Sequence, residues 1–511
     1  MKEISRKRKF ALSFIFEILL EIVTGVCGFI VPRLILSNFG SADNGLIQSI
    51  TQFLGCIAIL RSGIGSVMRA ALYKPLVEKN YSEISSIVKA TEIFLRKISY
   101  IFVIFTLVFA FVYPFIVQNE FDWLFSSSLV IILSVSTFAQ YYFGLTYQML
   151  IQADQSNYVL SITQIICVIL NTIASYILIK LGFSIHIVKL ATAVIFALQP
   201  MVYMFYAKKK YNIIKNVEPK NSLISERWDA FGHQLASFIN SNTDIIVATI
   251  FLGVKEVSVY SVIYMVANAI KKIIMAISNS ITGAFGNMMA KKEKALLEKR
   301  FAQYELIIYT LASLLFTVTF VSIFPFLSIY TRGITDIDYI REGLIIAICI
   351  TEFFSCVKLP YQMIIYAHGD FKKTKIYAYI EAAINIVLSL ILVNQFGLTG
   401  IVIGTCLAAI FQSIVFSRYM STKIIKHANI KTVKCVLTSL CASVLIIAIS
   451  KTVEYIPNTY LEWAIYSLIL FIISAFISFL CLVVINYKDA KAIIKFMTSK
   501  AKRIIKKCRL I

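Results

Sequence analysis

The chain has 511 residues, of which 59% are hydrophobic and 15% charged, and its mean hydropathy is +0.80. This composition is too apolar for a soluble globular protein of this length and indicates a polytopic membrane protein. The net charge of +23 fits a basic belt facing anionic lipid, so we expect membrane lipid and no nucleic acid as a partner. The ten cysteines include no C-x-x-C pair and the four histidines do not cluster, so no metal site, cofactor or disulfide framework is expected.

Fourteen apolar runs of about 20 residues or more follow one another, each long enough to cross roughly 30 Å of hydrocarbon. The predicted fold class is therefore an all-α polytopic membrane protein with about 14 transmembrane helices. The runs lie near 10–32, 46–68, 93–117, 124–150, 158–179, 185–207, 229–252, 257–283, 303–330, 343–366, 376–396, 398–420, 435–454 and 462–486.

An internal repeat organises the first twelve of these runs. Tyr147-Gln148-Met149 recurs 214 positions later as Tyr361-Gln362-Met363, and eight positions of this 25-residue window are identical. Gly40 and Gly253 hold nearly the same offset earlier in each copy. An even number of spans in each copy makes the repeats parallel, and the expected binding site then lies between them.

The repeat and a polar break define the expected domains. They are an N-terminal six-helix lobe (1–207), a cytoplasmic linker (208–228), a C-terminal six-helix lobe (229–420), an additional helix pair (421–486) and a basic amphipathic tail (487–511). Placing the N-terminus inside puts most of the 50 Lys and Arg residues in cytoplasmic segments. We therefore expect both termini in the cytoplasm. The richness of the sequence in Lys, Ile and Asn indicates a bacterial source, so the expected location is the bacterial cytoplasmic (inner) membrane.

Four cations lie well inside the predicted spans, away from their ends, where charge is costly and is a functional hypothesis by default. Arg61 lies in the second span, Lys271 and Lys272 in the eighth, and Lys358 in the tenth. By the repeat register Arg61 and Lys271 fall about one helical turn apart. We interpret them as a central cationic site that binds substrate. Unrelated structural charges are the alternative, and Lys358 is also long enough to reach the inner headgroups.

Intramembrane carboxylates are the second group of candidates. Glu17 and Glu21 lie four apart in the first span at a depth similar to that of Arg61, so they are either a structural pair for Arg61 or an ion-coupling site. In the seventh span, a polar stripe formed by His233, Ser237, Asn240 and Asp244 is expected to face water or protein. Asn240 and Asp244 would bind a coupling ion, H⁺ or Na⁺; helix-to-helix hydrogen bonding is the alternative. Glu352 and Glu381 are weaker candidates.

Several remaining features bear on function class. No Gly-Lys dipeptide occurs in the chain, so a P-loop is absent and nucleotide hydrolysis is not expected. The outer loops are short, which argues against an outer catalytic domain, and we expect no catalytic residues and no enzyme activity. Tyr147 and Tyr361 are interpreted as members of an interfacial aromatic belt. Gly400-x-x-x-Gly404 is interpreted as a helix-packing motif.

The span arrangement of six, six and two, together with several short segments, resembles the Wzx-type flippases of O-antigen and capsular polysaccharide repeat units. These flippases fall within the multidrug/oligosaccharidyl-lipid/polysaccharide (MOP) exporter superfamily. The segments are the turns at Gly40 and Gly253, Ala71-Leu72-Tyr73-Lys74-Pro75-Leu76, Asp244-Ile245-Ile246, and Tyr260-Ser261. The resemblance implies two six-helix lobes around a central cavity and a substrate of undecaprenyl diphosphate carrying a short oligosaccharide. It also implies cations in the second and eighth helices, which Arg61 and Lys271 or Lys272 match in kind.

The expected function is movement of this lipid-linked oligosaccharide to the outer leaflet by alternating access, for surface polysaccharide biosynthesis. A polysaccharide polymerase and chain-length proteins are the protein partners that this role implies. One alternative is a multidrug or cation antiporter of the same superfamily. Such an antiporter would be expected to have carboxylates, and not cations, in its cavity. A membrane polysaccharide polymerase or glycosyltransferase is a further alternative, although such enzymes are expected to carry a sizeable outer loop.

Overall fold

The computed structural model describes residues 6–61, 64–214, 216–220, 228–425, 429–450 and 455–485, and the predicted tail 487–511 lies outside them. Within these residues the chain is helical and contains no strand. A helix satisfies every backbone N–H and C=O inside one segment, which is the only solution open to a single apolar segment in lipid. The predicted all-α polytopic membrane fold is confirmed.

The chain forms two compact units, one of Met1–Val259 with Gly333–Ile337 and the other of Tyr260–Arg332 with Asp338–Ile511. The lobes 1–207 and 229–420 were assigned from the repeat, and that assignment stays a prediction. The first unit holds α1 (Arg6–Phe39), α2 (Ser41–Leu54), the 3₁₀ helix η1 (Gly55–Arg61), α3 (Ile64–Glu78), α4 (Tyr81–Val117), α5 (Trp123–Ala139), the π-helix η2 (Gln140–Gly144), α6 (Leu145–Ala153), α7 (Asn157–Lys180), α8 (Ile185–Lys210), α9 (Trp228–Phe251) and the first turn of α10 (Val254–Ala290).

The second unit holds the rest of α10 and six further helices. They are α11 (Lys294–Tyr330), α12 (Glu342–Val357), α13 (Leu359–His368), α14 (Phe371–Lys423), α15 (Asn429–Ser450) and α16 (Tyr460–Ile485). Helix α11 lies against α12, α15 and α16, and its side chains are buried along most of its length. It is therefore the central helix of this unit.

Ten helices in the described part of the chain are long and apolar enough to cross a membrane. Helix α14 has 53 residues, which at 1.5 Å per residue is about 80 Å, more than twice the hydrocarbon thickness. Gly397 interrupts it with φ 57° and ψ −136°, a left-handed conformation that favours glycine. Helix α14 is therefore two spans joined at Gly397, as the runs 376–396 and 398–420 predict.

The two halves of α14 pack closely because of two glycines. A Cβ at Gly400 would lie 2.2 Å from the carbonyl oxygen of Leu392, and one at Gly404 would lie 2.7 Å from the backbone nitrogen of Ser389. The Ser389 hydroxyl also donates to the carbonyl of Ile401 at 3.1 Å. The Gly400-x-x-x-Gly404 packing motif is confirmed, and it works within one helical hairpin.

Three spans that the sequence predicts as regular α-helices depart from regular α-helical geometry in the structure. The second span divides into α2, η1 and α3; the fourth into α5, η2 and α6; and the tenth into α12 and α13. The break in the tenth span follows from Pro360 at the start of α13, because proline cannot donate the backbone hydrogen bond that continues a helix. The spans were predicted from the length of each apolar run, and run length carries no information on changes of helix type within the run.

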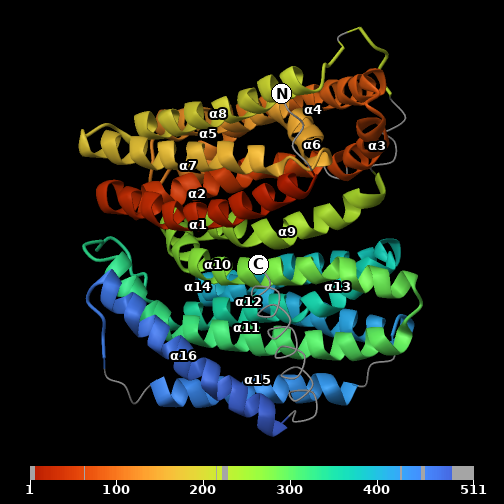
Figure 1. Cartoon of the computed structure of the whole chain (residues 1–511). Coiled ribbons are helices and arrows are strands. Elements are labelled where there is room, and N and C mark those ends of the chain that lie inside the picture. The colour runs from red at the N-terminus through yellow and green to blue at the C-terminus, as the bar shows by residue number, and fades with distance from the viewer. Residues whose placement is uncertain are drawn as a thin grey trace, which may run out of the picture. The chain divides into compact units, whose positions relative to one another are not determined.

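In the first unit, α5, α7 and α8 lie side by side, and α1 packs along α7 (Figure 1). Asp154, just after α6, links α1 and α8 at one end. Its carboxylate pairs with Lys9 of α1 at 2.9 Å and Lys210 of α8 at 2.6 Å, and it accepts a hydrogen bond from Tyr211 at 2.8 Å. Burial acts to raise the pKa of Asp154, but the hydrogen bonds from Lys210 and Lys9 outweigh it and hold that pKa below its usual 3.8.

We expect Asp154→Asn to lower the free energy of unfolding by about 1–3 kcal/mol at pH 7, because two ammonium groups lose their counter-ion. The folded pKa is depressed, so the stabilisation is present above the unfolded pKa and is lost as the pH falls through the lower folded value. Thermal unfolding of the purified protein at pH 7 and pH 3 measures this.

The difference in unfolding free energy between the parent and Asp154→Asn should be smaller at pH 3 than at pH 7. Glu78→Gln is the control: its i,i+4 pair with Lys74 spans 3.8 Å and is exposed, so we expect a loss below about 0.5 kcal/mol. An Asp154→Asn deficit that is the same at both pH values contradicts the pairing.

Candidate functional site

Arg61 ends the irregular middle of the second span. It is the last residue of η1 and its side chain is exposed. Its guanidinium carbon lies 6.0 Å from the centroid of the Tyr141 ring, at the outer limit of a cation–π contact. Among the described residues, no carboxylate lies within ion-pairing distance of it. A 3₁₀ stretch inside a span often marks a functional hinge, and here it presents an uncompensated charge.

Tyr141 comes from a second irregular segment, the π-helix η2, and is itself buried. The position of η2 depends on Gly144, whose added Cβ would lie 2.3 Å from the Cβ of Pro200 in α8. A π-helix widens the backbone by one residue and is frequent at functional sites. The first unit thus brings two irregular helical segments together at the Arg61 guanidinium.

Lys271 and Lys358, in the second unit, each have a glutamate partner. Lys271 of α10 pairs with Glu352 of α12 at 2.8 Å. Lys358 pairs with Glu381 of α14 at 3.0 Å, and it also donates to Gln412 at 2.5 Å. A charge taken out of water is tolerated when it is paired and hydrogen-bonded. Both lysines are therefore locally neutralised.

Lys272 and the glutamates of α1 are exposed. Lys272, next to Lys271, does not share its neighbour's partial burial. Glu17 accepts a hydrogen bond from Ser161 of α7 at 3.1 Å, and Glu21 is one helical turn further along α1. The described residues hold no ion pair between Arg61 and either glutamate, so the structural pair considered from the sequence is not formed.

Asn240 and Asp244 lie one turn apart in α9. Asp244 is buried, and the side-chain oxygen of Asn240 is buried with no hydrogen-bond partner among the described residues. The side chains of His233 and Ser237, the other members of the predicted stripe, lie outside the described residues. An ion-coupling role for Asn240 and Asp244 stays a prediction.

The repeated tyrosines are both buried, so their interpretation as an aromatic belt is wrong. Tyr361 is 1% exposed, and it donates to the buried Glu305 at 2.6 Å. Tyr309 lies 2.8 Å from the Tyr361 hydroxyl, and Thr432 of α15 donates to Glu305 at 2.9 Å. Sequence reasoning missed Glu305.

The first copy of the repeat carries a related arrangement. Tyr147 is 2% exposed and lies near Glu92, which pairs with Arg96 at 2.7 Å. Glu92 and Glu305 are 213 positions apart, almost the offset of the tyrosines. That spacing was the signal that could have identified both glutamates.

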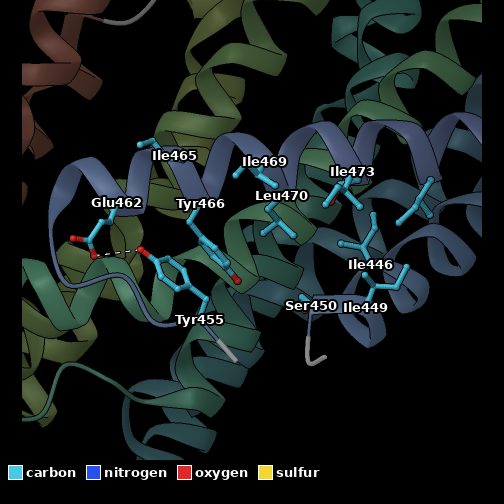
Figure 2. Close-up of a pocket in the computed structure, with 12 residues that line it drawn as sticks. Ile446, Ile449, Ser450, Tyr455, Glu462, Ile465, Tyr466, Ile469, Leu470 and Ile473 are labelled. Carbon is cyan, nitrogen blue, oxygen red and sulfur yellow. Dashed lines mark hydrogen bonds between the residues drawn. The ribbon is translucent and has the colours of Figure 1, made fainter. Parts of the chain in front are cut away.

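An apolar cavity of about 350 Å³ lies between α15 and α16 in the second unit (Figure 2). Isoleucine and leucine side chains point into it from both helices, among them Ile446, Leu470 and Ile473. Tyr455 and Glu462, 3.4 Å apart, close one end with polar atoms. The lining chemistry suits a hydrocarbon chain better than a sugar or a phosphate.

No protein-family model matches the chain, and no curated protein matches it. Solved structures do match it. The lipid II flippase MurJ in an inward-closed conformation is similar with a TM-score of 0.71 at 16% identity, over 93% of this chain and 100% of that one. An inward-facing multidrug resistance MATE family transporter of the MOP superfamily has a TM-score of 0.63 at 15% identity, over 80% and 99%.

A Vibrio cholerae MATE transporter has a TM-score of 0.54 at 13% identity, over 82% of this chain and 97% of that one. Identities this low establish the fold and nothing beyond it. The chain is a multi-pass membrane protein with the fold of MOP-superfamily transporters.

The Lys271–Glu352 pair gives a prediction that separates a structural pair from two independent charges. We expect Lys271→Met and Glu352→Gln each to lower the unfolding free energy by about 3–5 kcal/mol, because each leaves one charge buried without its counter-ion. The double variant should lose less than either single variant, since neither charge remains.

Thermal unfolding of the four proteins under one set of conditions measures this coupling. Lys272→Met, at the exposed neighbouring position, is the matched control and should unfold like the parent. Losses that simply add in the double variant would refute the pairing.

Proposed function

We propose that the protein is a flippase that moves undecaprenyl-diphosphate-linked oligosaccharide repeat units from the cytoplasmic to the outer leaflet by alternating access. The product would serve surface polysaccharide biosynthesis, such as O-antigen or capsule. The observation that carries this proposal is Arg61, an exposed guanidinium inside the predicted second span with no carboxylate partner among the described residues. The similarity in fold between this chain and a lipid II flippase, over 93% of the chain, supports a lipid-linked substrate.

The chemistry of a diphosphate matches that of Arg61. A guanidinium presents a planar fork of donors that binds two phosphate oxygens at once, whereas an ammonium acts as a point charge. Lys271 and Lys358 already neutralise glutamates, so Arg61 is the primary phosphate ligand in this proposal. Lys272, also exposed, is the second. Lys271 and Lys358 would bind the diphosphate only if each lysine left its glutamate partner and paired with a phosphate oxygen instead.

The cavity between α15 and α16 suits the tail of the same substrate. A prenyl chain is a branched hydrocarbon, and the isoleucines and leucines that line the cavity offer it the same apolar contact that lipid does. The two parts of the substrate would thus have separate sites: Arg61 for the diphosphate and the apolar cavity between α15 and α16 for the prenyl tail.

The membrane potential supplies part of the driving force in this mechanism. An inside-negative potential favours outward movement of an anion by about 2.3 kcal/mol per charge per 100 mV, which is roughly 4–5 kcal/mol for two uncompensated charges. H⁺ or Na⁺ coupling at Asn240 and Asp244 would reset the carrier. A polysaccharide polymerase and chain-length proteins would take up the product on the outer side.

A multidrug or cation antiporter is the second candidate, favoured by the similarity in fold to MATE transporters. In that case the buried carboxylate of Asp244 would bind the exchanged cation, and Arg61 would have no role in recognition. Altered sensitivity to cationic drugs on deletion, without accumulation of lipid-linked sugar, would select this function.

We expect Arg61→Ala to reduce flipping by about ten-fold or more, because charge-assisted hydrogen bonds to phosphate contribute about 1.5–3 kcal/mol. Arg61→Lys should retain part of the activity. The measurement is accumulation of undecaprenyl-diphosphate-linked oligosaccharide on the inner leaflet of cells that make the sugar.

Lys74→Ala removes an exposed cation outside the site and is the matched control. All variants must be present in the membrane at the parental level. Parental flipping by Arg61→Ala would overturn the assignment of Arg61, and absence of accumulation on deletion of the whole protein would overturn the flippase.

Tyr141 is expected to act as a positioning residue for Arg61. Tyr141→Phe keeps the ring face and should retain most of the activity, while Tyr141→Leu removes it and should lower flipping several-fold. In the double variant Arg61→Ala with Tyr141→Leu, flipping should equal that of Arg61→Ala alone. A further drop in the double variant would show that Tyr141 acts independently of Arg61.

A further inference from the structure

Two glycines with nearly the same backbone conformation begin equivalent helices of the repeat. Gly40 precedes α2 with φ 91°, and Gly253 precedes α10 with φ 89°. A helix begins after each glycine. The first backbone N–H groups of that helix have no partner within it and carry the positive end of the helix dipole. An acidic side chain placed at either end is therefore stabilised.

Each of these helix ends receives a carboxylate from the other copy of the repeat. Asp336, in the connection after α11, accepts from the backbone N–H of Ser41 at 3.0 Å and from its hydroxyl at 2.8 Å. Glu120, in the connection after α4, accepts from the backbone N–H of Val254 at 3.1 Å. Glu120 and Asp336 are 216 positions apart, so the two caps are equivalent in the repeat and reciprocal.

The two capped helices also touch directly, all within the first unit. Asn44 of α2 donates to Ser258 of α10 at 2.8 Å, and these two residues are 214 positions apart, the repeat offset itself. A Cβ at Gly45 would lie 1.7 Å from the backbone oxygen of Val254. Only glycine allows this approach of α2 to the first turn of α10.

A line of polar contacts continues from this point between α2 and α9. Ser49 lies 2.8 Å from the Thr249 hydroxyl and accepts from Tyr113 at 2.8 Å, and all three are buried. Gln52 hydrogen-bonds Asn242 further along. Polar contacts of this kind can be exchanged for water when they separate, at a smaller cost than opening an apolar core.

We propose that Glu120 and Asp336 form a latch that closes this end of the protein, and that both caps must break before substrate is released there. In the predicted topology this is the outer end, because the connections after α4 and α11 lie outside. The consequence for transport rests on the proposed flippase function, whereas opening of the latch does not.

The first experiment locks the contact. Asn44→Cys with Ser258→Cys places two thiols where the side chains now meet, and mild oxidation should join them. We expect flipping to fall to background in the oxidised double variant and to return on reduction, while each single variant is unaffected by oxidation. Parental flipping by the fully cross-linked protein would overturn the proposal.

The second experiment weakens the caps and measures opening without substrate. Ser258→Cys, buried in the closed state, is labelled from outside with a membrane-impermeant maleimide, and the parent chain gives the background from native thiols. Adding Asp336→Asn or Glu120→Gln should raise the labelling rate about five-fold, and both together more than ten-fold. Glu462→Gln is the matched control, because Glu462 accepts from Asn458 next to its own helix α16.

A wedge tests the same closure with both carboxylates intact. Gly45→Ala introduces the methyl group that meets the Val254 backbone, so it should raise labelling of Ser258→Cys by at least as much as the loss of one cap. Gly28→Ala in α1, where a Cβ meets nothing within 4 Å, should leave labelling unchanged.

Labelling that does not respond to the cap variants or to the wedge would overturn the latch, whatever the protein transports. Labelling that responds in a protein that fails to move lipid-linked oligosaccharide would support the latch and overturn the proposed function. The two proposals can therefore fail separately.

Discussion

The cost of holding an ionised side chain inside an apolar helix is the constraint on which the rest of the structure depends. In the second unit the constraint is met by pairing, since Lys271 contacts Glu352 and Lys358 contacts Glu381. Arg61 meets it differently: its side chain is exposed against the face of Tyr141, at a point where the span is no longer α-helical. The same constraint is thus met by pairing at Lys271 and Lys358 and by exposure at Arg61.

Two of the irregular segments in the described residues lie where a neighbouring helix packs closely against them. The π-helix η2 lies where Gly144 meets Pro200 of α8, and the break in α14 lies at Gly397, with Gly400 and Gly404 bringing the two arms together. In lipid an interrupted helix leaves backbone groups without partners, so a break survives only where packing or polar side chains compensate it. These positions are where a span can change shape without losing its hydrogen bonds.

The repeat appears in the structure as equivalent contacts with different chemistry. Tyr147 and Tyr361 are both buried with a glutamate nearby. Glu92 pairs with Arg96, whereas Tyr309, at the position equivalent to Arg96, contacts the Tyr361 hydroxyl. The caps of α2 and α10 differ less, with an aspartate in one and a glutamate in the other. The two copies are therefore more alike at these helix caps than around the buried tyrosines.

The sequence by itself determined the fold class, the apolar runs and the repeat, because hydrophobic length and a fixed offset are one-dimensional properties. It also identified Arg61, Lys271 and Lys358 as unusual charges, since a cation in an apolar run is visible without coordinates. Only the tertiary structure decided which of them have partners, because Glu352 and Glu381 are 81 and 23 positions away along the chain and apolar periodicity carries no information on which helix faces meet. The breaks in the spans and the buried state of Tyr147 and Tyr361 were decided in the same way, by packing between helices that no local pattern specifies.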